Sequence, residues 1–576
     1  MLCKSCTPVY RVNKTFCKLT KDKNQKMSKN LSELSGRKGV EENLFDKMGK
    51  LAVDTGAPSK EQLEELAEEF LIGKSTTYGT TTFYDFLRPE NKGKKVYVCN
   101  GSACLCAGTQ PKVIEQLSAK FDPEEIGHMT CLGRCHENSA FFYKDTNYSG
   151  RAIYTLEEIV SQQVSKEDNY HCEAVGAQVL TEEYPGIEQY YAPFKAALTR
   201  NPEAILEEIK TSGIRGRGGA GFPMGNKLEF CKNVSNDTKF IICNADEGDP
   251  GAYSDRYLLE KRPHSVLFGM MISGFVTGAS WGIVYIRAEY PESVATIEAA
   301  IQELRDNDLI GQNIQGSGFN FDLKVIKAQG SYICGEETAL INSIEGQRPE
   351  VRVRPPYPAV QGLFNKPTVV NNVETLAALH YIIREGGTAY ANIGTEKSTG
   401  TKLICLDSFF NRPGVYEIEM GISLNAVINE LGKGFKEPVK ALHIGGPLGG
   451  IVPEGKFGDL TVDFESFSDN GFLLGHASVV SIPNSFPMIQ YLEHLFDFAS
   501  YESCGKCFPC RLGTKRGQEL MTKAISGEHK IDRYLLEDLL HTLEVGSLCA
   551  HGGGIPLPIK NTLTYFDEEL SNYFAN

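Results

Sequence analysis

The stretch IRGRGGAGFP, residues 214–223, decides how the centre of this chain folds and what it can bind. Its core, GRGGAG at 216–221, has the G-x-G-x-x-G spacing, and its four glycines let backbone N–H groups surround a phosphate. Phe222 and Pro223 follow directly and give the loop a defined shape. A flexible surface loop is the alternative, but this composition favours a phosphate-binding loop.

The surroundings of the loop separate it from an ordinary dinucleotide-binding turn. Arg215, Arg217 and Lys227 are expected to add positive charge. A dinucleotide-binding G-x-G-x-x-G follows a strand, whereas PEAILEEIKTSGI at 202–214 has the pattern of a helix. The sequence therefore predicts a phosphate loop outside the usual Rossmann context.

Three further segments carry polar side chains after predicted strands. ICNADEGDPG (242–251) follows a strand, GSYICGEETAL (330–340) is expected to be a strand followed by a helix, and TVVNNVET (368–375) holds two adjacent amides. Such groups can bind a divalent metal or ribose hydroxyls, and their position at strand ends favours a site over a solvated loop. The side chains concerned are Asn244, Asp246, Glu247, Asp249, Glu336, Glu337, Asn371 and Asn372.

A first set of cysteines has metal-ligand spacing. Cys99 and Cys104 are spaced C-x4-C, and Cys131 and Cys135 are spaced C-x3-C. Four thiolates suit zinc or an iron–sulfur cluster, and zinc sites more often use C-x2-C, so the spacing favours [2Fe-2S]. Cys106 is expected to be a packed thiol outside this set.

A second set of cysteines lies near the end of the chain. Cys504, Cys507 and Cys510 form C-x2-C-x2-C within ESCGKCFPCR, and Cys549 follows in SLCAHGGG. Three close thiolates with a remote fourth are typical of [4Fe-4S] ligation, with zinc as the alternative. The isolated Cys172, Cys231, Cys243, Cys334 and Cys405 are expected to be packed core thiols.

Two stretches of the chain resemble known redox subunits. YGTTTFYDF (78–86), VCNGSAC (98–104) and TCLGRC (130–135) resemble the thioredoxin-like [2Fe-2S] subunit of respiratory complex I over about residues 41–165. GIRGRGGAGFP, NADEGDPG, GSYICGEETALINSIEG and PTVVNNVETLA resemble the FMN- and NADH-binding flavoprotein subunit of complex I over about 200–576. Diaphorase subunits of soluble hydrogenases and formate dehydrogenases share this resemblance.

The resemblance implies roles for individual residues. Asp249 stands where complex I has Glu, and Arg354 where Lys is expected, which leaves the preference between NAD and NADP open. Glu336 and Glu337 are the implied catalytic residues, because they would shape the electrostatics of flavin and nicotinamide. The implied FMN residues are Gly216, Gly218, Gly219, Lys227, Asn244, Asp246, Tyr332, Gly335, Glu336, Asn371 and Asn372. The implied NADH residues are Phe222, Phe230, Asp249, Glu337, Arg354 and Tyr357.

Composition limits the classes of function. The net charge is −14, and the first 30 residues carry +7, so the remainder is strongly acidic and unsuited to nucleic acid. No apolar run reaches the roughly 18–20 residues needed to span a bilayer. Clustered cysteines without an export signal favour the cytoplasm. The basic leader is expected to be a disordered tail, with a targeting peptide or a metal-binding Cys3, Cys6 and Cys17 as alternatives.

These observations predict an α/β multidomain protein. It is expected to combine a thioredoxin-like [2Fe-2S] domain, a Rossmann-like FMN domain, a β-grasp (ubiquitin-like) domain and a four-helix bundle with [4Fe-4S]. The predicted boundaries are leader 1–30, helical segment 41–92, thioredoxin-like domain 93–165, linker 166–199, FMN/NAD domain 200–395, β-grasp domain 396–485 and helical bundle 486–576.

The predicted function is a diaphorase-type NADH dehydrogenase. Hydride would pass between NAD(H) and FMN, and single electrons would pass through [2Fe-2S] and [4Fe-4S] clusters to other redox subunits. A hydrogenase or formate dehydrogenase catalytic subunit and a further iron–sulfur subunit are the expected partners. The alternatives are an electron-bifurcating subunit that also serves ferredoxin, and a wiring scaffold with an inactive flavin site; the intact GRGGAGFP loop opposes the scaffold.

Overall fold

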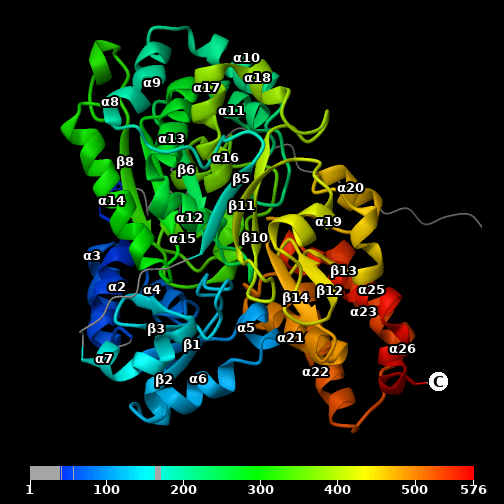
Figure 1. Ribbon diagram of the computed structural model, residues 1–576. Coiled ribbons are helices and arrows are strands. Elements are labelled where there is room, and N and C mark those ends of the chain that lie inside the picture. The colour runs from blue at the N-terminus through cyan, green and yellow to red at the C-terminus, as the bar shows by residue number, and fades with distance from the viewer. Residues whose placement is uncertain (1–38, 41, 56, 162–169, 576) are drawn as a thin grey trace, which may run out of the picture.

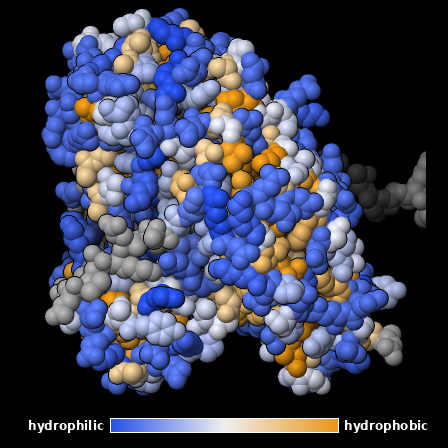
Figure 2. All heavy atoms as spheres, in the orientation of Figure 1, coloured by the Kyte–Doolittle hydropathy of each residue, from blue (hydrophilic) through white to orange (hydrophobic). Residues whose placement is uncertain are grey.

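A computed structural model describes residues 39–40, 42–55, 57–161 and 170–575 (Figure 1). The basic leader with Cys3, Cys6 and Cys17 lies outside the described residues. Most of the face in Figure 2 is hydrophilic, with apolar patches toward the β-rich and C-terminal part. Within the described ranges, no helix is long and apolar enough to cross a membrane.

A parallel four-stranded sheet forms the centre of the molecule. Its strand order is β8-β7-β6-β9, so the chain moves outward from β6 in one direction and later returns to pair with the other edge of β6. In parallel sheets a ligand crevice forms where the strand order reverses, here between β6 and β9. The strands are β6 (Phe240–Ala245), β7 (Trp281–Ile286), β8 (Asp322–Lys327) and β9 (Thr368–Asn372).

Helices cover this sheet and confirm the α/β prediction (Figure 1). The helix expected before the glycine-rich loop is present as α10, and α11 begins directly after the loop. α13 is almost completely buried, which explains why most of its side chains are apolar. The covering helices are α10 (Pro202–Thr211), α11 (Met224–Lys232), α12 (Ser254–Lys261), α13 (Pro263–Thr277), α14 (Pro291–Asp306), α15 (Glu337–Ile344), α16 (Val373–Ala377) and α17 (Leu379–Glu385).

In the described residues of the N-terminal part, three helices are followed by a small four-stranded sheet. α3 begins at Lys60, directly after Ser59, which forms a capping box with Gln62. Strands are present at 96–99 and 141–143, and the sheet order is β2-β1-β3-β4. The elements are α2 (Leu44–Thr55), α3 (Lys60–Glu69), α4 (Lys74–Thr81), β1 (Val96–Cys99), α5 (Ser102–Cys106), α6 (Gln110–Leu117), β2 (Ile126–Met129), β3 (Phe141–Tyr143), β4 (Thr146–Tyr148) and α7 (Leu156–Val160).

The segment 166–199, predicted as a linker, contributes to a sheet where the structure describes it. β5 (His171–Val175) pairs in parallel with β11 (Gly414–Glu419), and α8 (Ile187–Tyr190) and α9 (Ala192–Ala197) follow. The buried carboxylate of Glu417 accepts the N–H groups of residues 179–181, which fixes the segment after β5. The strand escaped prediction because its partner is distant in sequence and its side chains are only partly buried.

Two small sheets and a group of helices complete the chain. The segment 396–485, predicted as a β-grasp domain, supplies β10 and β11 of the sheet β10-β11-β5 and all of the sheet β13-β12-β14, and helices are present after residue 486 as predicted. The remaining strands are β10 (Thr401–Leu406), β12 (Val439–Ile444), β13 (Gly450–Pro453) and β14 (Val479–Pro483). The C-terminal helices are α21 (Met488–Tyr501), α22 (Phe508–Ile525), α23 (Arg533–Gly546), α24 (Ala550–Gly554), α25 (Pro556–Tyr565) and α26 (Asp567–Leu570).

Candidate functional site

The predicted polar residues gather at the carboxyl ends of β6 and β9. Asn244 and Asn372 are register partners across the two strands. The side-chain amide of Asn244 donates to the Gly335 carbonyl at 2.8 Å, so the segment beyond β8 closes over the same crevice. The structure thus brings together three segments that are far apart in sequence.

The glycine-rich loop lies against this crevice. A Cβ atom on Gly218 would lie 2.9 Å from Cβ of Asn372, closer than real contacts allow. Gly219 has a φ of +110° and packs against the backbone of Gly475 and His476. Glycine is therefore required at these two positions for the loop to approach the strand ends.

The two arginines of the loop do not face the crevice, contrary to prediction. Arg215 pairs with Glu465 at 2.6 Å and donates to the Gly221 carbonyl. Arg217 is 1% exposed and donates to the Tyr390 hydroxyl at 3.0 Å. Both guanidinium groups hold the loop through contacts with the protein. Lys227 is therefore the remaining predicted cation for the crevice.

Several buried polar atoms in this region have no protein partner among the described residues. They include Asn371 Nδ2 and Asp246 Oδ2. Buried polar groups without partners are costly, so these atoms fit a polar ligand that supplies both donors and acceptors. The hydroxyl-bearing chain, ring and phosphate of FMN have this chemistry.

Residues 332–335 form a short 3-10 helix instead of the predicted strand. The helix opened by Glu337 is present as α15. The carboxylate of Glu336 accepts the N–H groups of Thr338 and Ala339, both at 2.9 Å, and thereby caps α15. Its position is therefore fixed by the backbone, whatever it contacts in a ligand.

Glu337 connects two cations at the mouth of the crevice. Its carboxylate lies 3.4 Å from Nζ of Lys227 and 3.1 Å from Arg354. Three aromatic side chains that lie within a few positions of Lys227 or Arg354 in the sequence are exposed: Phe222 by 44%, Phe230 by 51% and Tyr357 by 58%. Exposed rings suit the stacking of a nucleotide, and charges held in fixed positions suit its polar recognition.

Asp249 is held by a neighbouring loop. The Tyr332 hydroxyl donates to its carboxylate at 2.8 Å, and the Tyr332 N–H donates to Glu502 at 2.9 Å. Burial raises the pKa of Asp246 well above its usual range. Acidic groups of the crevice are thus tied to the segment that precedes Cys504.

The first cysteine set converges on one buried point. Sγ of Cys131 lies 3.5 Å from Sγ of Cys135, and Cys99 interacts with both Cys104 and Cys131. All four thiols are buried. A convergent, all-sulfur donor set fits [2Fe-2S]. Cys106 is buried, as predicted, whereas Cys172 is exposed on β5 and does not fit the prediction of a core thiol.

The first set is also joined directly to the central domain. The Gly251 N–H, from the loop after β6, donates to Sγ of Cys135 at 3.2 Å. Arg287 donates to the Thr130 carbonyl at 3.1 Å, and Arg134 lies 3.4 Å from the carboxylate of Glu292. An N–H directed at a cysteine sulfur tunes the potential of a bound cluster. Sequence patterns gave no signal for the Gly251 contact.

The second cysteine set lies at helix starts. Cys507 is the N-cap of α22 and Cys549 that of α24. Burial, with the thiols of Cys507, Cys549 and Cys504 close by, raises the pKa of Cys510 to about 12. Such thiols need a cationic partner to ionise, so the set fits [4Fe-4S]. Cys507 and Cys549 are half-buried, and Cys504 and Cys510 are buried.

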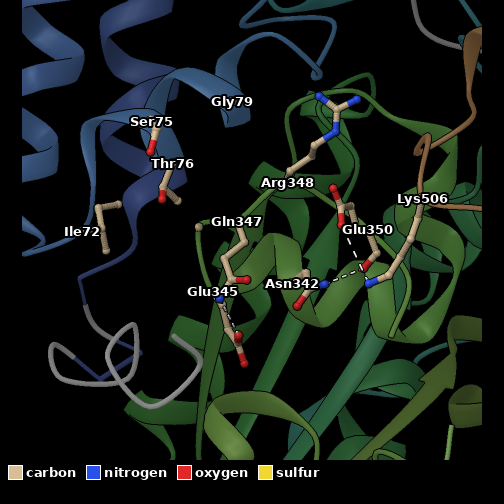
Figure 3. A pocket seen from close by; sticks show the side chains of 11 residues that line it. Ile72, Ser75, Thr76, Gly79, Asn342, Glu345, Gln347, Arg348, Glu350 and Lys506 are labelled. Atoms are coloured by element: carbon tan, nitrogen blue, oxygen red, sulfur yellow. Dashed lines mark hydrogen bonds and ion pairs between the residues drawn. The ribbon is translucent and has the colours of Figure 1, made fainter. Parts of the chain in front are cut away.

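A surface hollow of about 370 Å³ lies between α4 and the end of α15 (Figure 3). Its lining includes Thr76, Asn342, Arg348 and Lys506, and no residue implied for FMN or NADH. Lys506 points toward Glu350 across the rim, with 3.8 Å between their charged groups. The hollow is a seam beside the second cysteine loop and is separate from the crevice at β6 and β9.

Comparisons with known proteins agree with this geometry. Three family profiles match, the Nuo51 FMN-binding domain over 209–381, the NADH-ubiquinone oxidoreductase-F iron-sulfur binding region over 490–573, and the thioredoxin-like [2Fe-2S] ferredoxin over 38–163. The F 2 subunit of the NADH-quinone oxidoreductase of Rhizobium meliloti is 40% identical over 66% of this chain and 91% of that protein.

Two further relatives belong to hydrogenases. The HndC subunit of the NADP-reducing hydrogenase of Solidesulfovibrio fructosivorans is 41% identical over 66% of this chain and 78% of that protein. A crystal structure of an NAD+-reducing [NiFe]-hydrogenase in its H2-reduced state superposes with a TM-score of 0.81 at 27% identity. The superposition covers 92% of this chain and 93% of the hydrogenase chain.

Proposed function

Since the chain belongs to the family of NADH-quinone oxidoreductase F subunits, we propose that it takes hydride from NADH and delivers single electrons to a partner subunit. It is an NADH dehydrogenase-type flavoprotein subunit of a multisubunit redox enzyme, with FMN, [2Fe-2S] and [4Fe-4S] as its cofactors. When bound, FMN supplies the exchange between one hydride and two single electrons, and the clusters supply one-electron transfer.

The protein's own part is to bind and orient. We assign the crevice between β6 and β9 to FMN, with Asn244, Asn371 and Asn372 at its floor and the glycine-rich loop above them. The orphaned polar atoms there support this assignment. The implied residues Gly216, Gly335 and Asp246 belong to the same crevice by this assignment.

We assign the mouth of the crevice to the nicotinamide nucleotide. Phe222 and Phe230 offer exposed ring faces, and Glu337 is held between Lys227 and Arg354. Because hydride transfer needs no general base, Glu337 would orient and select the nucleotide and would not move a proton.

The observation that carries the proposal is the junction between crevice and second cysteine set. Burial raises the pKa of the Cys549 thiol to about 11, and the charge of Glu336, which caps α15 at the crevice, acts in the same direction. Tyr332 contacts both Asp249 and the His551 ring, two residues beyond Cys549. A cluster held there adjoins the flavin site, which suits electron transfer out of it.

The test is anaerobic purification of the chain. It should carry one FMN, identified after release, and its visible flavin absorbance should bleach on addition of NADH. Iron and sulfide should match one [2Fe-2S] and one [4Fe-4S]. Failure of the flavin-free protein to rebind FMN would contradict the proposal, whatever its iron content.

A second candidate, electron bifurcation with ferredoxin, is favoured by one contact. The loop after β6 donates the Gly251 N–H to Cys135, so the first cysteine set also adjoins the crevice. Two clusters beside one flavin site would allow two electron branches. Ferredoxin reduction by the electron donor of the assembled enzyme, H2 or formate, that occurs only when NAD+ is also present as the second acceptor would support this candidate.

Partners and location follow from the same reasoning. We propose that the chain works with a further iron–sulfur subunit and with the catalytic subunit of a hydrogenase or formate dehydrogenase. A hydrogenase partner is supported by relatives that are hydrogenase subunits. The cytoplasm is the proposed location, because a reducing compartment suits the free cysteines of the described chain.

A further inference from the structure

Three titratable side chains form a buried cluster behind the crevice. Glu247 follows β6, Asp255 lies in α12 and His476 precedes β14. Nε2 of His476 lies 3.3 Å from the carboxylate of Asp255 and 3.8 Å from that of Glu247. The three residues are 4%, 2% and 6% exposed, so their charges act in a region of low dielectric constant.

Two contacts connect this cluster to the assigned FMN site. Nδ2 of Asn372 donates to Asp255 at 2.6 Å, while Oδ1 of Asn372 accepts the Glu374 N–H at 3.0 Å. The orientation of the Asn372 amide is therefore set by Asp255 on one side and by α16 on the other. The glycine-rich loop meets the cluster as well, since a Cβ on Gly219 would lie 3.9 Å from the His476 backbone nitrogen.

The cluster also reaches toward the first cysteine set. The Tyr290 hydroxyl donates to Glu247 at 3.2 Å. A Cβ on Gly133, between Cys131 and Cys135, would lie 2.5 Å from that hydroxyl, so Tyr290 packs directly on the cysteine loop. The three buried charges thus occupy the space between the two assigned cofactor sites.

A bound cation is not needed to explain the cluster. Both oxygens of Glu247 already accept backbone N–H groups from the start of α12, those of Asp255 at 2.9 Å and Arg256 at 3.1 Å. The imidazole of His476 stands between the two carboxylates, where a protonated ring supplies the positive charge that a metal would bring. Two buried carboxylates with one imidazolium leave a net charge of −1.

We propose that the His476–Asp255 pair positions Asn372 and sets the midpoint potential of the flavin bound against it. The inference rests on the proposed function, because it requires FMN in the crevice. The pair is a positioning element and neither residue is assigned a contact with the reacting atoms. At pH 8, reduction adds negative charge to a flavin, so the imidazolium favours the reduced form.

The charge state of His476 agrees with this role. Although burial opposes ionisation, Asp255 raises the pKa of His476 to about 9, and Glu247 contributes in the same direction. Lys402 opposes ionisation, but it is paired with buried Glu374. Asp249 also faces the ring. His476 is therefore charged at pH 8, and its proton is lost as the pH rises through about 9.

The test is spectroelectrochemical titration of FMN in the intact protein. At pH 8, His476→Gln should lower the flavin midpoint potential, with the reduced-to-oxidised ratio at a fixed potential falling about tenfold. For a two-electron couple that change is about 30 mV. At an effective dielectric constant of about 20, one unit charge has an effect of this size on a group about 12 Å away.

Two further measurements separate electrostatics from packing. The potentials of wild type and His476→Gln should converge as the pH rises through about 9. In the Asp255→Asn background, the flavin potentials with and without His476→Gln should converge at a lower pH, because His476 loses its proton more readily without the carboxylate of Asp255. His443→Gln is the matched control, since His443 is also buried but its pKa is lowered to about 4, so it is neutral. It should leave the flavin potential unchanged.

The outcomes are distinguishable from failure of the proposed function. If the wild-type chain neither binds FMN nor bleaches with NADH, the proposed function is wrong. If FMN binds and bleaches normally but the His476→Gln potential equals that of wild type at pH 8, the inference is overturned. Should both variants fail to fold, the wild-type potential decides: its dependence on pH must change slope near pH 9, and an unbroken slope overturns the inference.

Discussion

Replacement of Gly218 by Ala should weaken FMN binding by about two orders of magnitude. The new Cβ would meet Cβ of Asn372 at 2.9 Å, so one of the two must move by about 0.5 Å or more. Asn372 is held by its cap on Glu374 N at 3.0 Å and by its hydrogen bond to Asp255 at 2.6 Å. Loss of the cap costs about 1 kcal/mol and of a hydrogen bond to a charged group about 1.5–3 kcal/mol. At 1.4 kcal/mol per tenfold, the sum of roughly 2.5–4 kcal/mol weakens binding about 60- to 700-fold.

The assay is titration of flavin-free protein with FMN, followed by quenching of flavin fluorescence. Gly216→Ala tests whether the added methyl group obstructs FMN itself. The nearest protein atom would be 3.6 Å from the new Cβ, so the fold should be unaffected. Gly79→Ala is the control, because Gly79 lies in α4 and no atom is within 4 Å of the added Cβ. It should lower neither the stability of the protein nor its affinity for FMN. Wild-type affinity in Gly218→Ala would refute the reasoning about Asn372.

Three other outcomes are expected. Glu337→Gln leaves Lys227 and Arg354 without their shared carboxylate, so FMN content should stay near normal while KM for NADH, or the preference between NADH and NADPH, changes several-fold; unchanged steady-state kinetics with both nucleotides would count against this placement. Cys507→Ser should abolish electron transfer to the partner subunit but spare the reduction by NADH of a dye that reacts directly with FMN. Cys131→Ser should reduce electron transfer less, unless the enzyme also reduces ferredoxin, in which case the ferredoxin activity should be lost. A normal rate of partner reduction by Cys507→Ser would exclude the route through the second cysteine set. Burial raises the pKa of Asp407 from 3.8 to about 6. Its ionisation in the folded protein therefore lowers the free energy of unfolding by about 3 kcal/mol as the pH rises from about 4 to 6. Asp407→Asn should make Tm less dependent on pH in that range.

Local sequence patterns predicted the elements that depend on local physics. The strand before Asp246 and both cysteine sets are present where short apolar runs and cysteine spacing indicated. Each depends on residues within a few positions of one another or on a short apolar run. The same reasoning identified the helix before the glycine-rich loop and so correctly separated it from a Rossmann turn.

What escaped prediction depends on partners distant in sequence. β5 is polar and half-buried, and becomes a strand only because β11, more than 200 residues later, offers a free edge. Arg217 faces inward because Tyr390 and the Thr399 carbonyl accept its guanidinium hydrogens. Glu336 was predicted to act on flavin, and the structure adds its cap on α15, which uses one carboxylate oxygen.

The loop after β6 shows why the assigned sites cannot be treated as independent. Asp249 in that loop accepts the Tyr332 hydroxyl beside the second cysteine set, whereas Gly251, two residues on, donates its N–H to Cys135 of the first. A shift of this loop changes a hydrogen bond at the flavin crevice and another at a cluster sulfur together. Since cluster ligation and folding are coupled, loss of either cluster should loosen the crevice as well. Any variant in this loop therefore needs flavin content and both clusters measured before a change in rate is assigned to one of them.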